Sequence, residues 1–243
     1  MKPLGHKAYG SIPHLSGSRV GPMDYHIHKG QEAILTEKLR DKNDRVIVTE
    51  KLDGSNVAVA RKNGSVFALT RAGYEASTSP YPMHHAFADW VRLRDWSNLP
   101  DGFRVSGEWM HTAHGTMYAP TDLLICFDAF GQDNRRLPHD EARAMFSALG
   151  LCGAHVISDG PPVSVDRALS ILGEVGFHGA TEQIEGAVWR CERRGVFDFM
   201  AKFVRHEKVD GKYLDSVTGK EPVVMARIED ATGGAVPARG WVA

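Results

Sequence analysis

Short apolar runs separated by polar and turn-forming residues recur along the chain and predict β-strands. They lie at residues 46–48, 57–60, 103–110, 123–130, 184–190 and 198–205. The run at 123–130 is nearly continuous in apolar residues, so we expect that strand to be central in its sheet.

Helical spacing is confined to separate blocks. Residues 82–96 predict one helix, with Phe87, Trp90 and Val91 facing inward, and residues 138–176 predict two further helical segments. Because strands dominate and helices come in a few blocks, we expect an α+β fold.

We expect residues 1–243 to form a single domain. The first 45 residues are rich in Gly, Pro, His and Lys, and they predict a loop-rich N-terminal arm (1–45) with weak helical spacing only at 31–40. Residues 136–180 resemble a helical insert in a sheet protein, and residues 212–243 a short C-terminal tail with little periodicity.

Asn63-Gly64 between two apolar runs is a strong signal for a β-hairpin, because a type I′ turn needs positive φ at both central positions. With these two residues as the loop, Asn56 falls opposite Arg71. Side chains directly opposite each other point to the same face of a sheet. Both should therefore line whatever site the turn at Lys51 builds.

Charge and cysteine content narrow the class of protein. Lys plus Arg number 29 against 30 Asp plus Glu, which excludes a globally basic nucleic-acid binder but permits a local basic groove. Three dispersed cysteines, Cys126, Cys152 and Cys191, suit a reducing compartment. The start has no signal-peptide pattern, and no stretch approaches the roughly 18 apolar residues of a membrane span. We expect a cytoplasmic protein, or a nuclear one if eukaryotic, that is not secreted and does not contact membranes.

Common nucleotide and metal motifs are absent: there is no G-x-x-x-x-G-K-[ST], no G-x-G-x-x-G after a strand, no H-E-x-x-H and no Cys-x-x-Cys. What remains is Lys51 at a strand end, followed by Asp53 and Gly54. A second K-x-D-G begins at Lys208, so the tetrapeptide alone says little. Lys51 differs because it follows an apolar strand and precedes a hairpin.

Further polar motifs follow Lys51 in order along the chain. They are Arg71, Ser106-Gly107-Glu108-Trp109, Cys126-Phe127-Asp128-Ala129-Phe130, Glu185-Gly186-Ala187-Val188-Trp189 and Ala201-Lys202-Phe203-Val204-Arg205. This series resembles the covalent nucleotidyltransferase superfamily of ATP-dependent DNA and RNA ligases and capping enzymes. The runs 49–56 and 9–13 are most similar to the phage-type RNA ligase 2 group.

The resemblance implies an ATP-grasp-like adenylyltransferase domain of antiparallel sheets with flanking helices and no OB-fold. It implies ATP and Mg²⁺ or Mn²⁺ as cofactors, with Lys51 attacking the α-phosphorus to form a lysyl-AMP intermediate. AMP then passes to a 5′-phosphate end, which is sealed to a 3′-hydroxyl, as in RNA repair. Attack needs a neutral amine, so we expect the site to lower the pKa of Lys51, with Lys202 and the metal as the cations that do so.

Roles for the other residues also follow from the resemblance. The cofactor-binding set is Glu50, Lys51, Asp53, Gly54, Asn56, Arg71, Glu108, Phe127, Glu185 and Lys202. Arg71 and Glu108 would hold the ribose, and Phe127 or Phe130 would stack on adenine. Glu185 would bind the metal, since Mg²⁺ prefers oxygen ligands.

Other carried-over roles concern the phosphates and the nucleic acid. Lys202 would act in catalysis at the α-phosphate, and Asn56 and Arg205 are candidate nucleic-acid contacts. The last motif departs from the K-x-K of these ligases, because Val204 replaces the second lysine. Adjacent strand residues face opposite sides, so Arg205 cannot take that place without a bulge.

An ATP-dependent RNA ligase is thus the leading interpretation. The alternatives are an ATP-dependent DNA ligase, a capping-type nucleotidyltransferase and a non-catalytic module that binds nucleic-acid ends. We expect the segment after Arg205 to be too short for the OB-fold that the first two carry. Nicked duplex RNA, broken RNA ends and a DNA–RNA hybrid all stay open as substrates, as does a partner protein that directs the chain to them.

Overall fold

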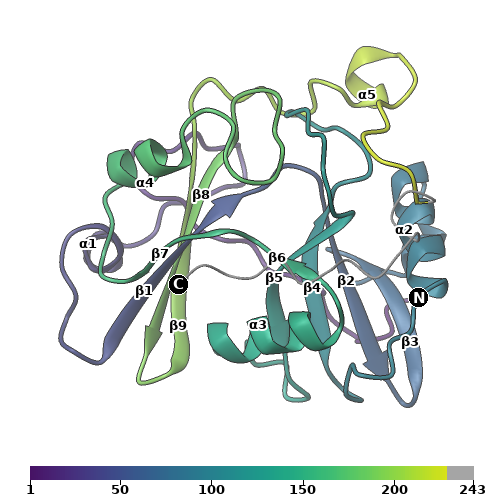
Figure 1. Cartoon of the computed structure of the whole chain (residues 1–243), viewed down its shortest axis with the longest axis horizontal. Coiled ribbons are helices and arrows are strands. Elements are labelled where there is room, and N and C mark those ends of the chain that lie inside the picture. Colours follow the sequence, from purple (N-terminus) through teal and green to yellow (C-terminus); the bar gives the residue numbers. More distant parts are fainter. Residues whose placement is uncertain (229–243) are drawn as a thin grey trace.

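Two β-sheets with helices on their outer faces make up the computed structural model, which describes residues 1–228 (Figure 1). The helices are α1 (Lys29–Thr36), α2 (Pro82–Arg92), α3 (His139–Ala148), α4 (Val165–Leu172) and α5 (Asp215–Thr218), with a 3-10 turn η1 at Ala76–Thr78. The strands are β1 (Asp44–Lys51), β2 (Ser55–Lys62), β3 (Ser65–Thr70), β4 (Arg104–Trp109), β5 (Leu124–Phe130), β6 (Cys152–Gly153), β7 (Val156–Gly160), β8 (Gly186–Arg193) and β9 (Val196–Val204). The expected α+β class is confirmed.

The first sheet has the order β7-β1-β8-β9 and the second the order β3-β2-β4-β5-β6. Neighbouring strands are antiparallel except β5 and β6. The prediction that the strand at 123–130 is central was wrong, because β4 is the middle strand and only the two-residue β6 lies beyond β5. Helix α3 packs on β5. The continuous apolar run of β5 therefore reflects its burial under this helix.

The hairpin prediction is confirmed. Asn63 and Gly64 have φ of 51° and 76°, and β2 pairs with β3 in the expected register. The ladder continues beyond the strands, since the Arg71 amide donates to the Asn56 carbonyl at 3.1 Å. The turn chemistry thus places Arg71 beside the end of β1.

The segment 136–180 contains the expected helices, α3 and α4, but it also contains β6 and β7. Strand β7 pairs with β1 along its length, so this segment joins the first sheet. Its short run Val156-Ile157 has too few apolar positions to reveal a period. The expected tail is partly described and contains α5; residues 229–243 lie outside the described part of the chain.

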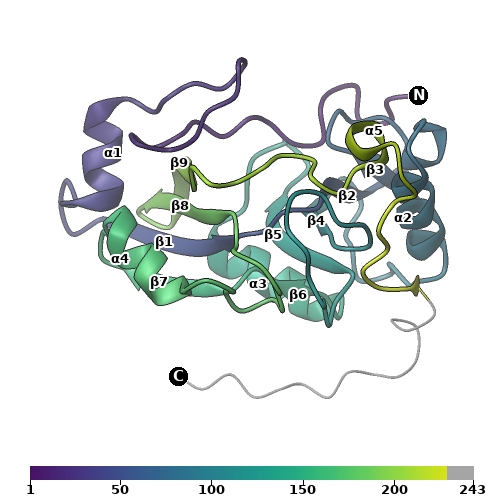
Figure 2. The same ribbon diagram turned by 90° about the horizontal axis from the view of Figure 1, so that it is seen from above.

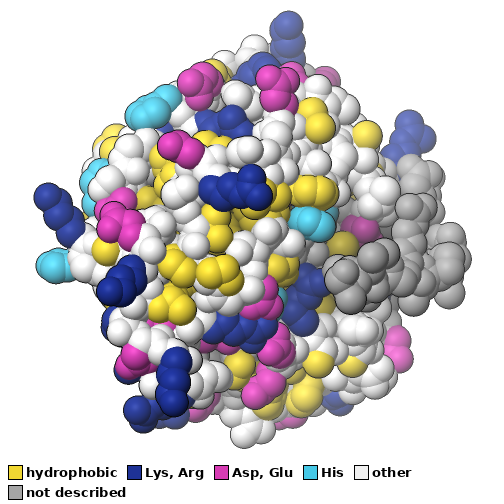
Figure 3. Space-filling model, turned by 60° about the vertical axis from the view of Figure 1, so that its left-hand side comes forward, with side chains coloured by type: hydrophobic (Ala, Val, Ile, Leu, Met, Phe, Trp, Pro, Cys, Tyr) yellow, Lys and Arg dark blue, Asp and Glu magenta, His cyan; other side chains and the backbone are white. Residues whose placement is uncertain are grey.

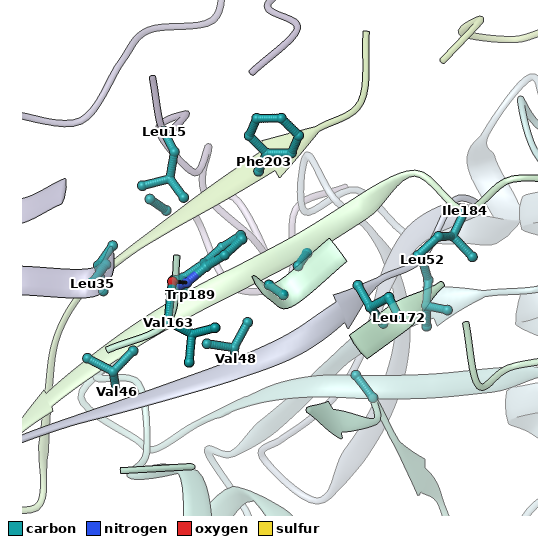
Figure 4. Packing of buried hydrophobic residues seen from close by; sticks show 14 of the residues in the cluster. Leu15, Leu35, Val46, Val48, Leu52, Val163, Leu172, Ile184, Trp189 and Phe203 are labelled. Atoms are coloured by element: carbon teal, nitrogen blue, oxygen red, sulfur yellow. Dashed lines mark hydrogen bonds between the residues drawn. The ribbon is translucent and has the colours of Figure 1, made fainter. Parts of the chain in front are cut away.

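Each sheet has its own apolar core. In the first, the fully buried Trp189 packs near Val163 and donates from its indole nitrogen to the Val163 carbonyl at 2.8 Å (Figure 4). In the second, Phe87 and Trp90 of α2 pack against Trp109, each with ring centroids 5.3 Å from that indole. The inward face predicted for this helix is confirmed, although the helix ends at Arg92.

The N-terminal arm lies across both sheets (Figure 2). Leu15 donates from its amide to the Lys202 carbonyl, and the Lys202 amide donates to the Pro13 carbonyl, both at 2.9 Å. Arg104 donates to the Ala8 carbonyl of the arm at 2.9 Å. The arm is therefore fixed to β9 and β4 by hydrogen bonds, although only α1 is helical.

A buried ionic cluster joins the two sheets. Asp128 of β5 has no exposed surface, and its carboxylate contacts Arg190 of β8 at 2.6 Å and Arg136 at 2.9 Å. The hydroxyl of Tyr9 donates to the same carboxylate at 2.5 Å. The cluster thus connects both sheets and the arm.

The face of the molecule shown in Figure 3 carries charges of both signs, because Lys and Arg side chains lie among Asp and Glu side chains. None of the helices within residues 1–228 is both long and apolar enough to cross a membrane.

We predict that Asp128→Asn lowers the free energy of unfolding by about 3 to 5 kcal/mol, because it leaves buried arginine charge without its partner. Urea unfolding measures this loss. Asp133→Asn is the control, since Asp133 forms an exposed ion pair with Arg135 and should change stability by less than about 0.5 kcal/mol. Equal stabilities for the two variants would contradict the role of the cluster.

Candidate active site

Lys51 lies where the chain passes from one sheet to the other. It is the last residue of β1, and β2 of the second sheet begins at Ser55. The turn between them requires glycine, because a Cβ at Gly54 would lie 2.6 Å from the carbonyl oxygen of Trp109. The tight turn therefore directs the Lys51 side chain into the space between the sheets.

That space is a pocket of about 700 Å³. Eight of the residues predicted to bind the nucleotide line it: Lys51, Asp53, Gly54, Asn56, Arg71, Glu108, Glu185 and Lys202. They come from both sheets and are spread over most of the chain. The structure thus brings them together, while their individual roles stay predictions.

The Lys51 amine donates to Oε2 of Glu185, the residue before β8, at 2.5 Å. Burial lowers the pKa of Lys51, but Glu185, Glu108 and Asp53 outweigh burial and leave the pKa above its ordinary value. The prediction that the protein groups around Lys51 lower its pKa was wrong. Three nearby carboxylates have more effect than the single amine of Lys202.

Glu108 and Asn56 lie opposite each other on β4 and β2. Burial raises the pKa of Glu108 to about 7, against the opposing effect of Lys51. Its Oε1 accepts from the Gly54 amide at 3.0 Å, which ties the carboxylate to the turn. Arg71 reaches the arm, where it donates to the Gly10 carbonyl at 3.2 Å.

Lys202 on β9 closes the other side of the pocket. Burial and the charge of Lys51 lower its pKa. Its amine lies 3.8 Å from Asp24 of the arm, which in turn contacts the His14 ring at 3.2 Å. The arm therefore places a carboxylate beside this amine.

A smaller pocket of about 90 Å³ lies deeper and shares Lys51 and Glu108 with the first. Phe127 and Glu50 line it. Phe127 meets Tyr9 edge to face at 5.0 Å, whereas Phe130 packs on the Arg104 guanidinium at 3.7 Å. Of the two aromatic candidates, Phe127 is the one on the pocket wall.

Glu50 is almost completely buried, and burial raises its pKa to about 7. Its Oε2 accepts from the Phe177 amide at 2.8 Å, while its Oε1 has no hydrogen-bond partner. Gly176 leaves room for this carboxylate, because a Cβ there would lie 2.3 Å from Oε1. The unpartnered Oε1 is therefore buried beside Gly176, a residue that does not line the deep pocket.

The end of β9 is different. Val204 is buried, and its amide donates to the Ser18 hydroxyl at 2.9 Å. Arg205 turns away from the pocket and donates to the Gly173 carbonyl at 2.7 Å. The geometry does not place Arg205 beside Lys202, so its predicted contact with nucleic acid has no support from the pocket.

Sequence reasoning missed Lys208. Its amine forms an ion pair with Asp53 and lies 3.7 Å from Oε2 of Glu185. The only signal was the second K-x-D-G, which gave no reason to place this lysine near Lys51. A contact across more than 150 positions of sequence depends on the fold and not on local pattern.

Comparisons with solved structures find similar folds. An archaeal ATP-dependent RNA ligase (form 1) is 21% identical over 81% of this chain and 48% of that chain, with a TM-score of 0.50. A variant of Naegleria gruberi RNA ligase with ATP and Mn is 15% identical over 79% of this chain and 59% of that one, with a TM-score of 0.52. Form 2 of the archaeal enzyme is 25% identical over 66% and 42%, with a TM-score of 0.48. The chain thus spans about half the length of these proteins.

No curated protein sequence matches the chain. The sequence profile of the RNA ligase family matches residues 44–204, which is most of the described chain. This range runs from the start of β1 to the end of β9 and includes Lys51, Glu108, Glu185 and Lys202. The chain belongs to the RNA ligase family.

Proposed function

We propose that the protein is an ATP-dependent RNA ligase that works through a covalent lysyl-AMP intermediate on Lys51. One observation carries the proposal: in a chain of the RNA ligase family, the Lys51 amine points into a pocket that also gathers Arg71, Glu108, Glu185 and Lys202. An amine nucleophile among cations and carboxylates suits the transfer of a charged phosphoryl group.

In the first step the neutral Lys51 amine attacks the α-phosphorus of ATP. A nitrogen–phosphorus bond forms, the bond to the bridging oxygen breaks and pyrophosphate leaves, while the amine proton passes to solvent. Lys202 faces the same pocket, where its amine can contact the α-phosphate. The fixed charges act where negative charge redistributes in the transition state.

The residues present fit a divalent cation held jointly with the nucleotide. No group of three or more His, Cys, Asp or Glu side chains able to hold a metal occurs within residues 1–228. Mg²⁺ commonly binds through one or two carboxylates together with substrate phosphates. Glu185, with Oε2 turned into the pocket, would hold Mg²⁺ or Mn²⁺, which when bound would neutralise phosphate charge and weaken the hold of Glu185 on the Lys51 proton.

The deep pocket suits the adenine base. Phe127 provides an aromatic wall, and ring stacking favours a flat base. The base proposed for this pocket is the adenine of ATP.

In the second step a 5′-phosphate oxygen attacks the phosphorus of lysyl-AMP, so that the nitrogen–phosphorus bond breaks and Lys51 regains a proton. In the third, a 3′-hydroxyl displaces AMP to form the phosphodiester. RNA, as a nicked duplex or as broken ends, is the proposed substrate, and Asn56 on the pocket wall is the proposed contact to its end. We extend this proposal to a DNA–RNA hybrid as a substrate and to a partner protein that brings the substrate to the ligase.

Incubation with α-labelled ATP and Mg²⁺ tests the nucleophile. We expect label to join the wild-type chain covalently and to be undetectable on Lys51→Ala, because the attacking atom is lost. Lys42→Ala is the matched control, since Lys42 is exposed in the turn before β1 and should label normally. Label that persists on Lys51→Ala would refute the assignment.

Glu185→Gln tests the metal proposal. We expect adenylylation at fixed Mg²⁺ to fall on the order of 100-fold, because a charged group is lost at the reacting phosphate. Excess EDTA should stop the wild type, and added Mg²⁺ or Mn²⁺ should restore it. The exposed Glu174→Gln serves as control. A Mg²⁺ titration that is the same for Glu185→Gln and wild type would remove Glu185 from the metal site.

A sealing assay tests the substrate. We expect nicked RNA to be joined faster than nicked DNA, and ATP to support the reaction better than GTP. Nicked RNA, nicked DNA, DNA–RNA hybrids and single strands are compared under one set of conditions. Equal rates on DNA and RNA nicks would indicate a general polynucleotide ligase, and adenylylation without sealing would indicate a different acceptor.

A further inference from the structure

Lys208 lies in the segment that follows β9, outside the series of motifs that resembles the ligases. Only 8% of its surface is exposed, which is rare for a lysine. Its amine contacts the Asp53 carboxylate and lies 3.7 Å from Oε2 of Glu185. The side chain therefore reaches two carboxylates that line the candidate active site.

Lys208 and Lys51 share one oxygen atom. Oε2 of Glu185 lies 2.5 Å from the Lys51 amine and 3.7 Å from the Lys208 amine. A phosphorus atom in position for attack must lie about 3 to 3.5 Å from the Lys51 nitrogen. The α-phosphate must therefore approach the Glu185 carboxylate with which both amines pair.

After Lys202, the end of β9 provides no second cation to the pocket. Val204, two residues after Lys202, is apolar and buried, and Arg205 bonds to the Gly173 carbonyl outside the pocket. Among the described residues, Lys51 and Lys208 are the two whose amines lie within ion-pair distance of a Glu185 oxygen. Lys208 therefore places a cation at this carboxylate from a position after the end of β9.

The surroundings of Lys208 are built to hold it there. The Gly115 amide donates to Oδ2 of Asp53 at 2.7 Å, on the carboxylate that Lys208 contacts. A Cβ at Gly115 would lie 2.6 Å from Cε of Lys208 and 2.4 Å from the Val209 carbonyl oxygen. Only glycine lets the lysine pass to Asp53 at this point.

Burial of an amine is costly unless partners compensate it, and an apolar side chain would pack here at less cost. An amine has three donors, so Lys208 can keep Asp53 while it donates to an incoming phosphate oxygen. We propose that Lys208 is a catalytic residue that contacts a non-bridging oxygen of the α-phosphate during lysine adenylylation. This inference rests on the proposed function and adds a residue to it.

Lys208→Met tests the proposal in single-turnover adenylylation at saturating ATP. We expect a rate on the order of 100-fold below wild type, because a donor to the developing charge is lost. Lys208→Arg, which keeps a cationic donor, should recover part of the rate. Lys212→Met is the control in the same segment, since the exposed Lys212 pairs with Glu182 and should leave the rate unchanged. Thermal unfolding verifies that each variant is folded.

Phosphorothioate ATP separates a phosphate contact from a structural role. Sulfur in place of one non-bridging α-oxygen should slow the wild type more for one diastereomer, and Lys208→Met should lose that slowing for the same diastereomer. The proposal is overturned if the wild type labels but Lys208→Met labels within twofold of it, or if the sulfur effects of both diastereomers are unchanged by the substitution. A wild type that does not label at all would instead refute the proposed function.

Discussion

The buried carboxylate of Asp128 is the interaction on which the arrangement of this molecule depends. It contacts Arg190 across the space between the sheets, and it accepts from Tyr9 of the arm. A charge without exposed surface is stable only when its partners are in place, so the cluster fixes how the two sheets face each other. Tyr9 also lines the pocket and meets Phe127, which links the cluster to the walls of the site.

The distribution of charge within the pocket follows from that arrangement. Lys51 and Lys202 line the pocket together with Asp53, Glu108 and Glu185, and Lys208, which does not line it, pairs with Asp53. The carboxylates keep the Lys51 amine protonated, while burial keeps the pKa of Glu108 near 7. The site thus holds the Lys51 amine in an ion pair with Glu185. Under the proposed function, the nucleotide with its cation would have to loosen that pair before attack.

The local sequence pattern was sufficient to predict those elements that contain a distinctive motif. The Asn63-Gly64 turn determines the register of β2 and β3, and this register places Arg71 beside the pocket because a two-residue loop leaves one pairing. Lys208, the Asp128 cluster and the strand β7 could not be predicted from the sequence, because each depends on contacts between distant segments. The continuous apolar run of β5 misled for a related reason: burial under α3 and burial in mid-sheet leave the same pattern.

The central claim is that the amine nitrogen of Lys51 forms a covalent bond to the α-phosphorus of a nucleotide. Its most direct test is mass spectrometry of the chain after incubation with ATP and Mg²⁺, before and after protease digestion. The account predicts a mass increase of one AMP, located on the peptide that contains Lys51 and removed by added pyrophosphate. An unmodified Lys51 peptide, or AMP on another residue such as Lys202 or Lys208, would contradict it.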